Sequence, residues 1–318
     1  MKSCYSRNQL FTALIAASFL FMSCTTYGSI EDTIVKTFDV GPGGILILKS
    51  DMGSIEVCGK PGNDVKVEVI REVRTGSEKK AQDILKDFDI RFDQKNGDVI
   101  IEAEYRKKGW QRFWNNIGKY LRVKFIITVP ERYNLDLDTK GGSISADSLV
   151  GDIEANTSGG SLHFDRIEGN IQGSTSGGSI KIGEVVGDTR VHTSGGSIRI
   201  MRAEGPVDAH TSGGSITLEE VLGTIKAHTS EGSVKASITH QPNSECRLTT
   251  SGGSITVYLS EEIGMYVDAH TSGGRISADF PLAVKGEISK NELKAELNNG
   301  GPELYLRTSG GSIYLKKF

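Results

Sequence analysis

A six-residue motif recurs along this chain and limits what the chain can fold into. Thr-Ser-Gly-Gly-Ser-Ile is first complete at residues 175–180, and the serine after the glycine pair recurs every 18 residues from Ser143 to Ser233. After further steps of 21, 21 and 37 residues, the same position is filled by Ser254, Arg275 and Ser312. A fixed period of this length indicates a repeat architecture, in which each unit buries its apolar face only against its neighbours.

Apolar and polar residues alternate on both sides of the motif. Counted from the serine, the positions eight and six before it and one and three after it are apolar or small in nearly every repeat. Around Ser179 these positions hold Ile171, Gly173, Ile180 and Ile182. Alternation with a period of two is typical of half-buried strands, and glycine suits tight turns. Each repeat therefore predicts two short strands joined by two tight corners.

A repeat of this size has no way to bury its apolar face alone, so the units are expected to stack in parallel, roughly 4.7–4.9 Å apart. We predict an all-β fold, a single-chain β-solenoid built from 18-residue two-strand coils. An irregular, strand-rich N-terminal cap with a short helix is expected to precede it. A row of separate hairpins is the alternative, and it explains the strict spacing poorly.

The sequence also resembles a known family. The run Lys-Phe-Ile-Ile-Thr-Val-Pro at residues 124–130, then Leu-Asp-Leu-Asp-Thr at 135–139, then the repeated Gly-Gly-Ser-Ile, is similar to the bacterial putative-adhesin domain with β-strand repeats, a domain of unknown function. The resemblance covers roughly residues 35 to 318. It implies a protein associated with the cell envelope, and it supplies no catalytic residues.

The N-terminus has the pattern of a secretory signal. Lys2 and Arg7 precede an apolar run at residues 10–22, and Phe-Met-Ser-Cys at residues 21–24 resembles a lipobox. We predict a signal peptide at 1–23, lipidation of Cys24 and a linker at 24–34. The protein would then be lipid-anchored in the bacterial cell envelope, at the outer membrane or facing the periplasm. Ordinary secretory cleavage, giving a secreted protein, is the alternative.

The mature chain divides into two regions. Residues 35–130 read as the cap, with an early coil at 46–57, strands at 64–71, 90–92 and 99–103, and a helix at 77–87 capped by Ser77. Residues 131–318 read as the solenoid, in which the 37-residue step is an irregular extra coil or an outgrown loop. The coil at 304–315 is predicted to close the chain.

One stretch of the cap region combines aromatic and basic residues. Four residues recur at helical spacing within residues 105–121: Trp110, Phe113, Trp114 and Ile117. This segment contains several basic residues and no acidic residue. One hypothesis is an amphipathic helix in contact with the membrane or a partner. The alternative is a cap whose aromatic side chains cover the end of the solenoid.

Three histidines occupy one column of the repeat. His192, His210 and His228 are spaced by 18 residues, and stacking is expected to bring neighbouring side chains within roughly 5 Å. The residue before each histidine is apolar and should point inward, so the imidazoles should project into solvent as a surface ladder. A flat line of histidines lacks the tetrahedral arrangement that zinc prefers, so we expect neither a metal nor another cofactor. A pH-sensitive ladder is a further hypothesis.

The remaining patterns do not indicate catalysis. Carboxylates are scattered, and no nucleophile elbow, zinc-binding helix or metal-spaced cysteine set occurs. A net charge of −3 offers no electrostatic argument for a nucleic-acid partner. We therefore expect a non-enzymatic, lipid-anchored surface module that presents polar ladders to a glycan or a protein. The alternatives are a carbohydrate-active β-helix enzyme and an envelope-stress or assembly factor that contacts a membrane protein.

Overall fold

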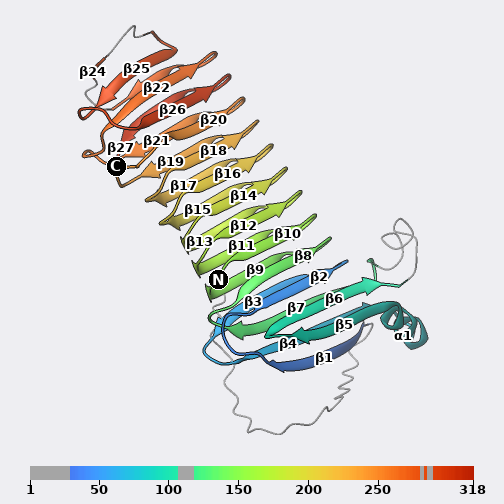
Figure 1. Cartoon of the computed structure of the whole chain (residues 1–318). Helices are drawn as coiled ribbons and strands as arrows, with labels where there is room; N and C mark the ends of the chain where they lie inside the picture. Colours follow the sequence, from blue (N-terminus) through green and yellow to red (C-terminus); the bar gives the residue numbers. More distant parts are fainter. Residues whose placement is uncertain (1–28, 107–117, 280–282, 285–288) are drawn as a thin grey trace.

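The computed structural model describes residues 29–106, 118–279, 283–284 and 289–318. In this part of the chain two long sheets face each other across a continuous core, and the coils stack along one axis with the single helix α1 (Glu78–Asp87) at one end (Figure 1). The β-solenoid prediction is confirmed. The predicted signal peptide, Cys24, and the residues Trp110, Phe113, Trp114 and Ile117 lie outside the described residues.

One sheet, here called sheet B, carries the strands that precede each Gly-Gly corner. Its order along the stack is β5 (Phe88–Lys95), β6 (Asp98–Tyr105), β2 (Ile45–Ser50), β8 (Asn134–Thr139), β10 (Ile153–Thr157), β12 (Ile171–Thr175), β14 (Thr189–Thr193), β16 (Val207–Thr211), β18 (Ile225–Thr229), β20 (Cys246–Thr250), β26 (Glu303–Thr308), β22 (Met265–Thr271), β25 (Glu292–Leu297) and β24 (Ala283–Val284).

The other sheet, sheet A, carries the strands that follow each corner. Its order is β1 (Ser29–Asp39), β4 (Asp64–Arg74), β7 (Leu121–Pro130), β3 (Ser54–Lys60), β9 (Ile144–Val150), β11 (Leu162–Glu168), β13 (Ile180–Val186), β15 (Ile198–Ala203), β17 (Ile216–Val221), β19 (Val234–Ile238), β21 (Ile255–Leu259), β27 (Ile313–Lys317) and β23 (Ile276–Ala278).

In the middle of the stack each coil pairs in parallel with the coil 18 residues away. Ile153 lies beside Ile171 on sheet B, and Leu162 lies beside Ile180 on sheet A. The predicted apolar columns point inward and are buried on both sheets. Where one column is small its neighbours are larger, as at Gly173, where a Cβ would lie 3.0 Å from Leu162 and 3.5 Å from Phe164.

Threonine and serine side chains repeat the same hydrogen bonds at each Gly-Gly corner. Thr193 Oγ1 donates to the carbonyl of Gly178 in the preceding coil at 2.7 Å and accepts from the Gly196 amide at 3.3 Å. The Ser197 amide donates to Ser179 Oγ at 3.2 Å. The buried threonine thus satisfies backbone groups that the turn leaves unpaired. It also ties each coil to the previous one.

The two glycines of the corner have different roles. A Cβ on the second glycine, for example Gly196, would lie far inside van der Waals contact with the carbonyl of Gly178, whereas a Cβ on Gly195 would meet nothing closer than 3.7 Å. This difference explains why Glu231 can stand at the first position of one coil. In the regular coils, close backbone approach therefore requires glycine at the second position, whereas a Cβ on Gly252, Gly273 or Gly310 in the later coils would lie 3.0–3.1 Å from a backbone carbonyl oxygen.

At the N-terminal end the order of coils in space departs from the order in the sequence. The first coil in the sequence, β2 and β3, is an early coil as predicted. However, β2 lies between β6 and β8, and β3 lies between β7 and β9. Antiparallel strands complete this end: β5 pairs with β6, and β4 joins β7 to β1.

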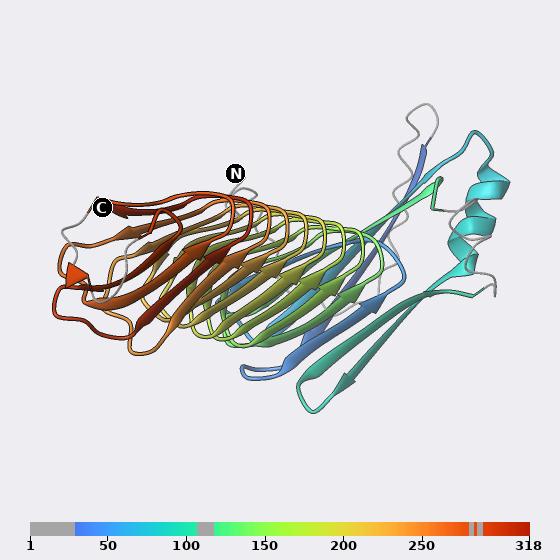
Figure 2. The ribbon, with the colours of Figure 1, turned by 90° about the horizontal axis from the view of Figure 1, so that it is seen from above.

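Helix α1 confirms the predicted helix and lies at the N-terminal end, beyond the flat coils (Figure 2). Ser77 is its N-cap and accepts a hydrogen bond from the Lys80 amide at 3.4 Å. The Arg71 side chain, only 13% exposed, forms an ion pair with Asp32 of β1 and also donates to the Leu85 carbonyl at 3.3 Å. Arg71 therefore connects the edge strand β1 to α1.

The C-terminal end differs from the prediction. The last coil in the sequence, β26 and β27, does not close the stack: β26 lies between β20 and β22, and β27 lies between β21 and β23. The 37-residue step is neither an extra coil nor a simple loop, because β25 folds back antiparallel onto the outer edge of β22. Cys246 consequently lies beside Leu304, and not beside Val267 as the repeat order predicts.

Candidate functional site

The outer face of sheet B is a regular array of polar side chains. On each strand, the residues seven and five positions before the corner serine point away from the core, and they form two columns that we call the outer columns. From β8 to β22 the pairs are Asp136 and Asp138, Glu154 and Asn156, Gln172 and Ser174, Arg190 and His192, Asp208 and His210, Lys226 and His228, Arg247 and Thr249, Tyr305 and Arg307, and Asp268 and His270.

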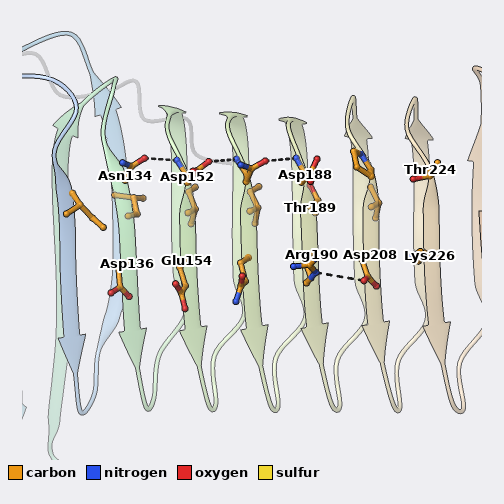
Figure 3. A pocket seen from close by; sticks show the side chains of 18 residues that line it. Asn134, Asp136, Asp152, Glu154, Asp188, Thr189, Arg190, Asp208, Thr224 and Lys226 are labelled. Atoms are coloured by element: carbon orange, nitrogen blue, oxygen red, sulfur yellow. Dashed lines mark hydrogen bonds and ion pairs between the residues drawn. The ribbon is translucent and has the colours of Figure 1, made fainter. Parts of the chain in front are cut away.

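A shallow groove of about 670 Å³ runs along one side of these columns, where β8 to β18 begin. Figure 3 shows a ladder of hydrogen bonds in its wall. Asn134 Oδ1 accepts from the Asp152 amide at 2.9 Å, and Asp152 Oδ1 accepts from the Asn170 amide at 2.8 Å. Asn170 Oδ1 accepts from the Asp188 amide at 2.9 Å. The ladder ends there because the next residue in the column, Pro206, has no amide hydrogen.

Most of the charged residues that line the groove are carboxylates, although Arg190 and Lys226 line it as well. Asp136, Asp152, Glu154 and Asp188 line it, and their labelled side chains lie along its length in Figure 3. Carboxylates accept several hydrogen bonds each, so the groove can bind a row of hydroxyl groups. Thr189 is also part of the wall: it is 2% exposed, and its Oγ1 has no hydrogen-bond partner.

The three histidines form one stacked column next to the groove. The ring centroids of His192 and His210 are 5.1 Å apart, and those of His210 and His228 are 4.7 Å apart. His228 Nδ1 lies 2.7 Å from Thr249 Oγ1. His192 and His210 are exposed, as the sequence predicts for side chains that project from the sheet. His270 lies on β22, separated from His228 by β20 and β26.

The histidine column is electrostatically coupled. Partial burial lowers the pKa of His210 below its usual value, and the neighbouring His228 and His192 lower it further, while Asp208 opposes them. Within the described ranges, no group of three or more His, Cys, Asp or Glu side chains is arranged to hold a metal ion. The lowered pKa means that His210 takes up a proton less readily than an isolated histidine.

Charge is distributed unevenly along the outer columns. β8 and β10 carry Asp136, Asp138 and Glu154, whereas the strands from β14 to β26 carry Arg190, Lys226, Arg247 and Arg307, which we call the cationic strip. Asp208 lies between Arg190 and Lys226 in the same column, and alternating charges on adjacent strands are ordinary in sheets.

Two of these cations are fixed by an aromatic ring. Tyr305 of β26 lies between the guanidinium groups of Arg247 and Arg307, each 4.0 Å from the ring centroid. Arg307 also donates to the backbone carbonyl and to Oδ2 of Asp268, both at 2.8 Å. Sequence reasoning missed this arrangement, because nothing in the repeat pattern shows that β26 lies beside β20.

Comparisons with known proteins identify a family. The sequence profile described as Toastrack DUF4097 matches residues 50–316. No curated protein matches the chain.

Solved structures of low similarity share most of its length. A putative cell adhesion protein from Clostridium sporogenes is 15% identical, with 91% of this chain and 100% of that chain covered and a TM-score of 0.25. A putative adhesin from Bacteroides fragilis is 14% identical, with 89% and 97% covered and a TM-score of 0.36. A putative lipid binding protein from Parabacteroides distasonis is 12% identical, with 89% and 96% covered and a TM-score of 0.43.

Proposed function

The chain belongs to the Toastrack DUF4097 family, whose description assigns no reaction, and we propose that it is a non-enzymatic, adhesin-like module of the bacterial cell envelope. Its outer face on sheet B binds a glycan of repeating structure. The groove and the outer columns are the binding surface, and the core columns serve only to hold that surface flat and regular.

The observation that carries this proposal is the repetition of the surface. The same outward positions recur on neighbouring strands in register, about 4.8 Å apart, and the groove crosses six of these strands. A surface that repeats along one axis suits a ligand that also repeats. The groove offers carboxylate and amide oxygens, which are suitable acceptors for sugar hydroxyl groups.

The position of β1 supports attachment to a membrane through Cys24. β1 begins at Ser29 at the extreme edge of sheet A, so a lipid on Cys24 would be at most roughly 20 Å from that edge. The sheet of 13 strands would then project roughly 55–60 Å from the bilayer and expose its outer face. None of the helices in the described residues is long and apolar enough to cross a membrane.

Binding can be tested with the full chain on an array of neutral and charged polysaccharides. The double variant Asp152→Asn/Glu154→Gln keeps the shape of the groove and removes two carboxylates, so we expect about tenfold weaker binding of neutral ligands. The matched control, Glu168→Gln/Glu219→Gln, removes two carboxylates from sheet A and should bind normally. Equal losses in both variants, or no glycan bound by the native chain, would refute a glycan site on sheet B.

Anchoring needs a separate experiment. Cells that express the native chain or Cys24→Ala are labelled with a fatty-acid analogue and fractionated. We expect the native chain to carry the label and remain with the membrane, and the variant to lose both. Release of an unlabelled native chain would instead favour a secreted protein, and membrane retention without label would indicate attachment through residues 105–121.

A further inference from the structure

The cationic strip on sheet B shares Arg190 and Lys226 with the groove, and binding of neutral sugars does not require its charge. We propose that Arg190, Lys226, Arg247 and Arg307 form a binding site for a linear, anionic glycan, and that the histidine column strengthens this binding as the pH falls. The inference rests on the proposed function and specifies the chemical class of its ligand.

The strip runs along the solenoid axis, perpendicular to the strands. Its cations lie on β14, β18, β20 and β26, which with β16 occupy consecutive places in sheet B. Arg190 and Lys226 share a column and are two strands apart, about 9.5 Å, and Lys226 and Arg247 are neighbours at about 4.8 Å. Cationic side chains therefore recur over roughly 19 Å in one direction, with the carboxylate of Asp208 between Arg190 and Lys226. This shape suits a chain of anionic groups better than a compact anion.

Two cations of the strip are available to a ligand. Lys226 is exposed and has no carboxylate within ion-pair distance among the described residues. Arg190 has a side chain that is 74% exposed, and its Nε lies 3.9 Å from Asp208 Oδ2, a contact that contributes little to stability at a surface. A ligand carboxylate can replace this contact at small cost.

The other two cations are held in place. Stacking on Tyr305 orients Arg247 and Arg307, and their contacts with Glu245 and Asp268 fix them further. Preorganised guanidinium groups lose less side-chain entropy when they bind an anion. The strip thus combines two mobile, exposed cations with two fixed ones.

The histidine column lies in the second outer column, directly beside Arg190 and Lys226, and Arg307 lies further along the same column. The polar and charged side chains that face the three imidazoles from their own and adjacent strands are Gln172, Ser174, Arg190, Asp208, Lys226, Arg247 and Thr249. Asp208 is the single carboxylate among them. Protonation of stacked rings 4.7–5.1 Å apart therefore places new positive charges beside existing cations.

An anionic chain laid along the strip relieves this repulsion. Binding and proton uptake by His192, His210 and His228 are then linked, so the affinity must rise as the pH falls through the titration range of histidine. Burial is the main cause of the lowered pKa of His210, and the neighbouring His228 and His192 add to it.

The acidic end of the same face limits where the ligand lies. Asp136, Asp138 and Glu154 occupy the equivalent positions on β8 and β10 and repel an anionic chain. Between them and Arg190 lie only the uncharged Gln172 and Ser174. The anionic glycan is therefore confined to the strands from β14 to β26.

The test uses the full chain and polygalacturonate as the probe, with neutral dextran and double-stranded DNA for comparison, at pH 5.5 and pH 7.5. We expect binding of polygalacturonate to be about tenfold tighter at pH 5.5. Arg190→Gln/Lys226→Gln should weaken it about tenfold, whereas Lys181→Gln/Arg199→Gln, which removes two cations from sheet A, should not. His192→Gln/His210→Gln/His228→Gln should abolish the pH dependence and keep the affinity measured at pH 7.5.

Several results would overturn the inference. These are no binding of polygalacturonate at pH 5.5, equal losses in the two double variants, or pH dependence that persists in the triple variant. DNA bound as tightly as polygalacturonate would overturn the assignment to a glycan. Thermal unfolding verifies that each variant is folded, and His210→Gln alone replaces the triple variant if that chain does not fold.

The groove variant Asp152→Asn/Glu154→Gln separates this inference from the proposed function. It should weaken binding of a neutral glycan but leave binding of polygalacturonate equal or tighter, because it removes negative charge from the same face. If the chain binds dextran or another neutral glycan but does not bind polygalacturonate, the proposed function is supported and the inference is refuted. Failure of every glycan refutes both.

Discussion

In the middle of the solenoid the order of the coils along the chain matches their order in space, whereas at its two ends it does not. From β8 to β19 each coil follows its predecessor both in sequence and in space. At the ends, β2–β3 and β26–β27 are each laid between two other coils. The same columns and the same corners occur in both regions, so local chemistry alone does not determine the order of the coils.

The difference shows what the apolar columns specify. A column fixes which residues point inward and how a coil aligns with its neighbour. It does not fix which coil that neighbour is, because Leu304 and Leu306 fit beside Cys246 and Leu248 as well as Val267 and Ala269 would. The connecting segment that contains β25 determines which coil is the neighbour, because β25 folds back on β22 and covers that coil's outer edge. The place beside β20 is then left for β26.

The largest expected effect comes from removing an inserted coil. Deletion of residues 303–318 takes away β26 and β27 and leaves β20 and β22 without their shared neighbour, whereas deletion of residues 180–197 removes one regular coil and rejoins equivalent positions. We expect the first deletion to lower the melting temperature by about 10 °C or more and the second by much less. Near-native stability after the first deletion would show that β22 moves beside β20 unaided.

The second prediction tests whether corners in both regions obey the same sterics. Gly196→Ala in the middle and Gly311→Ala in the inserted coil each place a Cβ against a backbone carbonyl, so each should lower the free energy of unfolding by about 3 kcal/mol. Gly195→Ala, with open space around its Cβ, should change it by less than about 0.5 kcal/mol. Chemical denaturation measures all three, and equal effects at positions 195 and 196 would contradict the steric explanation.

The third prediction concerns the buried threonines. Thr211→Val in the middle and Thr308→Val in the inserted coil each lose a hydrogen bond of 2.7 Å to a carbonyl of the neighbouring coil. Each substitution is nearly isosteric, so we expect a loss of about 1–2 kcal/mol in both regions. Thr217→Val, on the outer face of sheet A, serves as the control in the same denaturation experiment. A loss at only one of the two buried sites would mean that the inserted coil is held differently.

The smallest effect is a dependence of stability on pH that belongs to the middle alone. The pKa of His210 is lowered in the folded state, so the unfolded chain takes up the proton first. Stability should be unaffected above the usual titration range of histidine, near pH 6.5, and should fall as the pH drops through it. Melting curves of His210→Gln should therefore show a shallower decline. His270→Gln, whose strand neighbours carry no histidine, should follow the native curve.

Much of this architecture follows from the sequence, because the repeat makes each column visible many times. The strands, the inward positions, the helix capped by Ser77 and the early coil at 46–57 agree with the structure. The position of β26 was missed, since Leu304 and Leu306 match the repeat pattern wherever the coil is placed.

The candidate site was predictable only in part. The histidine column follows directly from the 18-residue spacing. The cluster of Tyr305 with Arg247 and Arg307 depends on strands that are distant in sequence and adjacent in space. No local pattern contains that information, because it arises from the insertion of the last coil.

The inserted coil also changes how the molecule would carry a mechanical load. A coil at the very end of a stack has one neighbour and can be peeled away one hydrogen bond at a time. β26 and β27 each have a neighbour on both sides, so a pull on the chain at Phe318 must shear two ladders on each sheet together. Extraction of this segment therefore requires breaking the hydrogen bonds with both neighbouring coils.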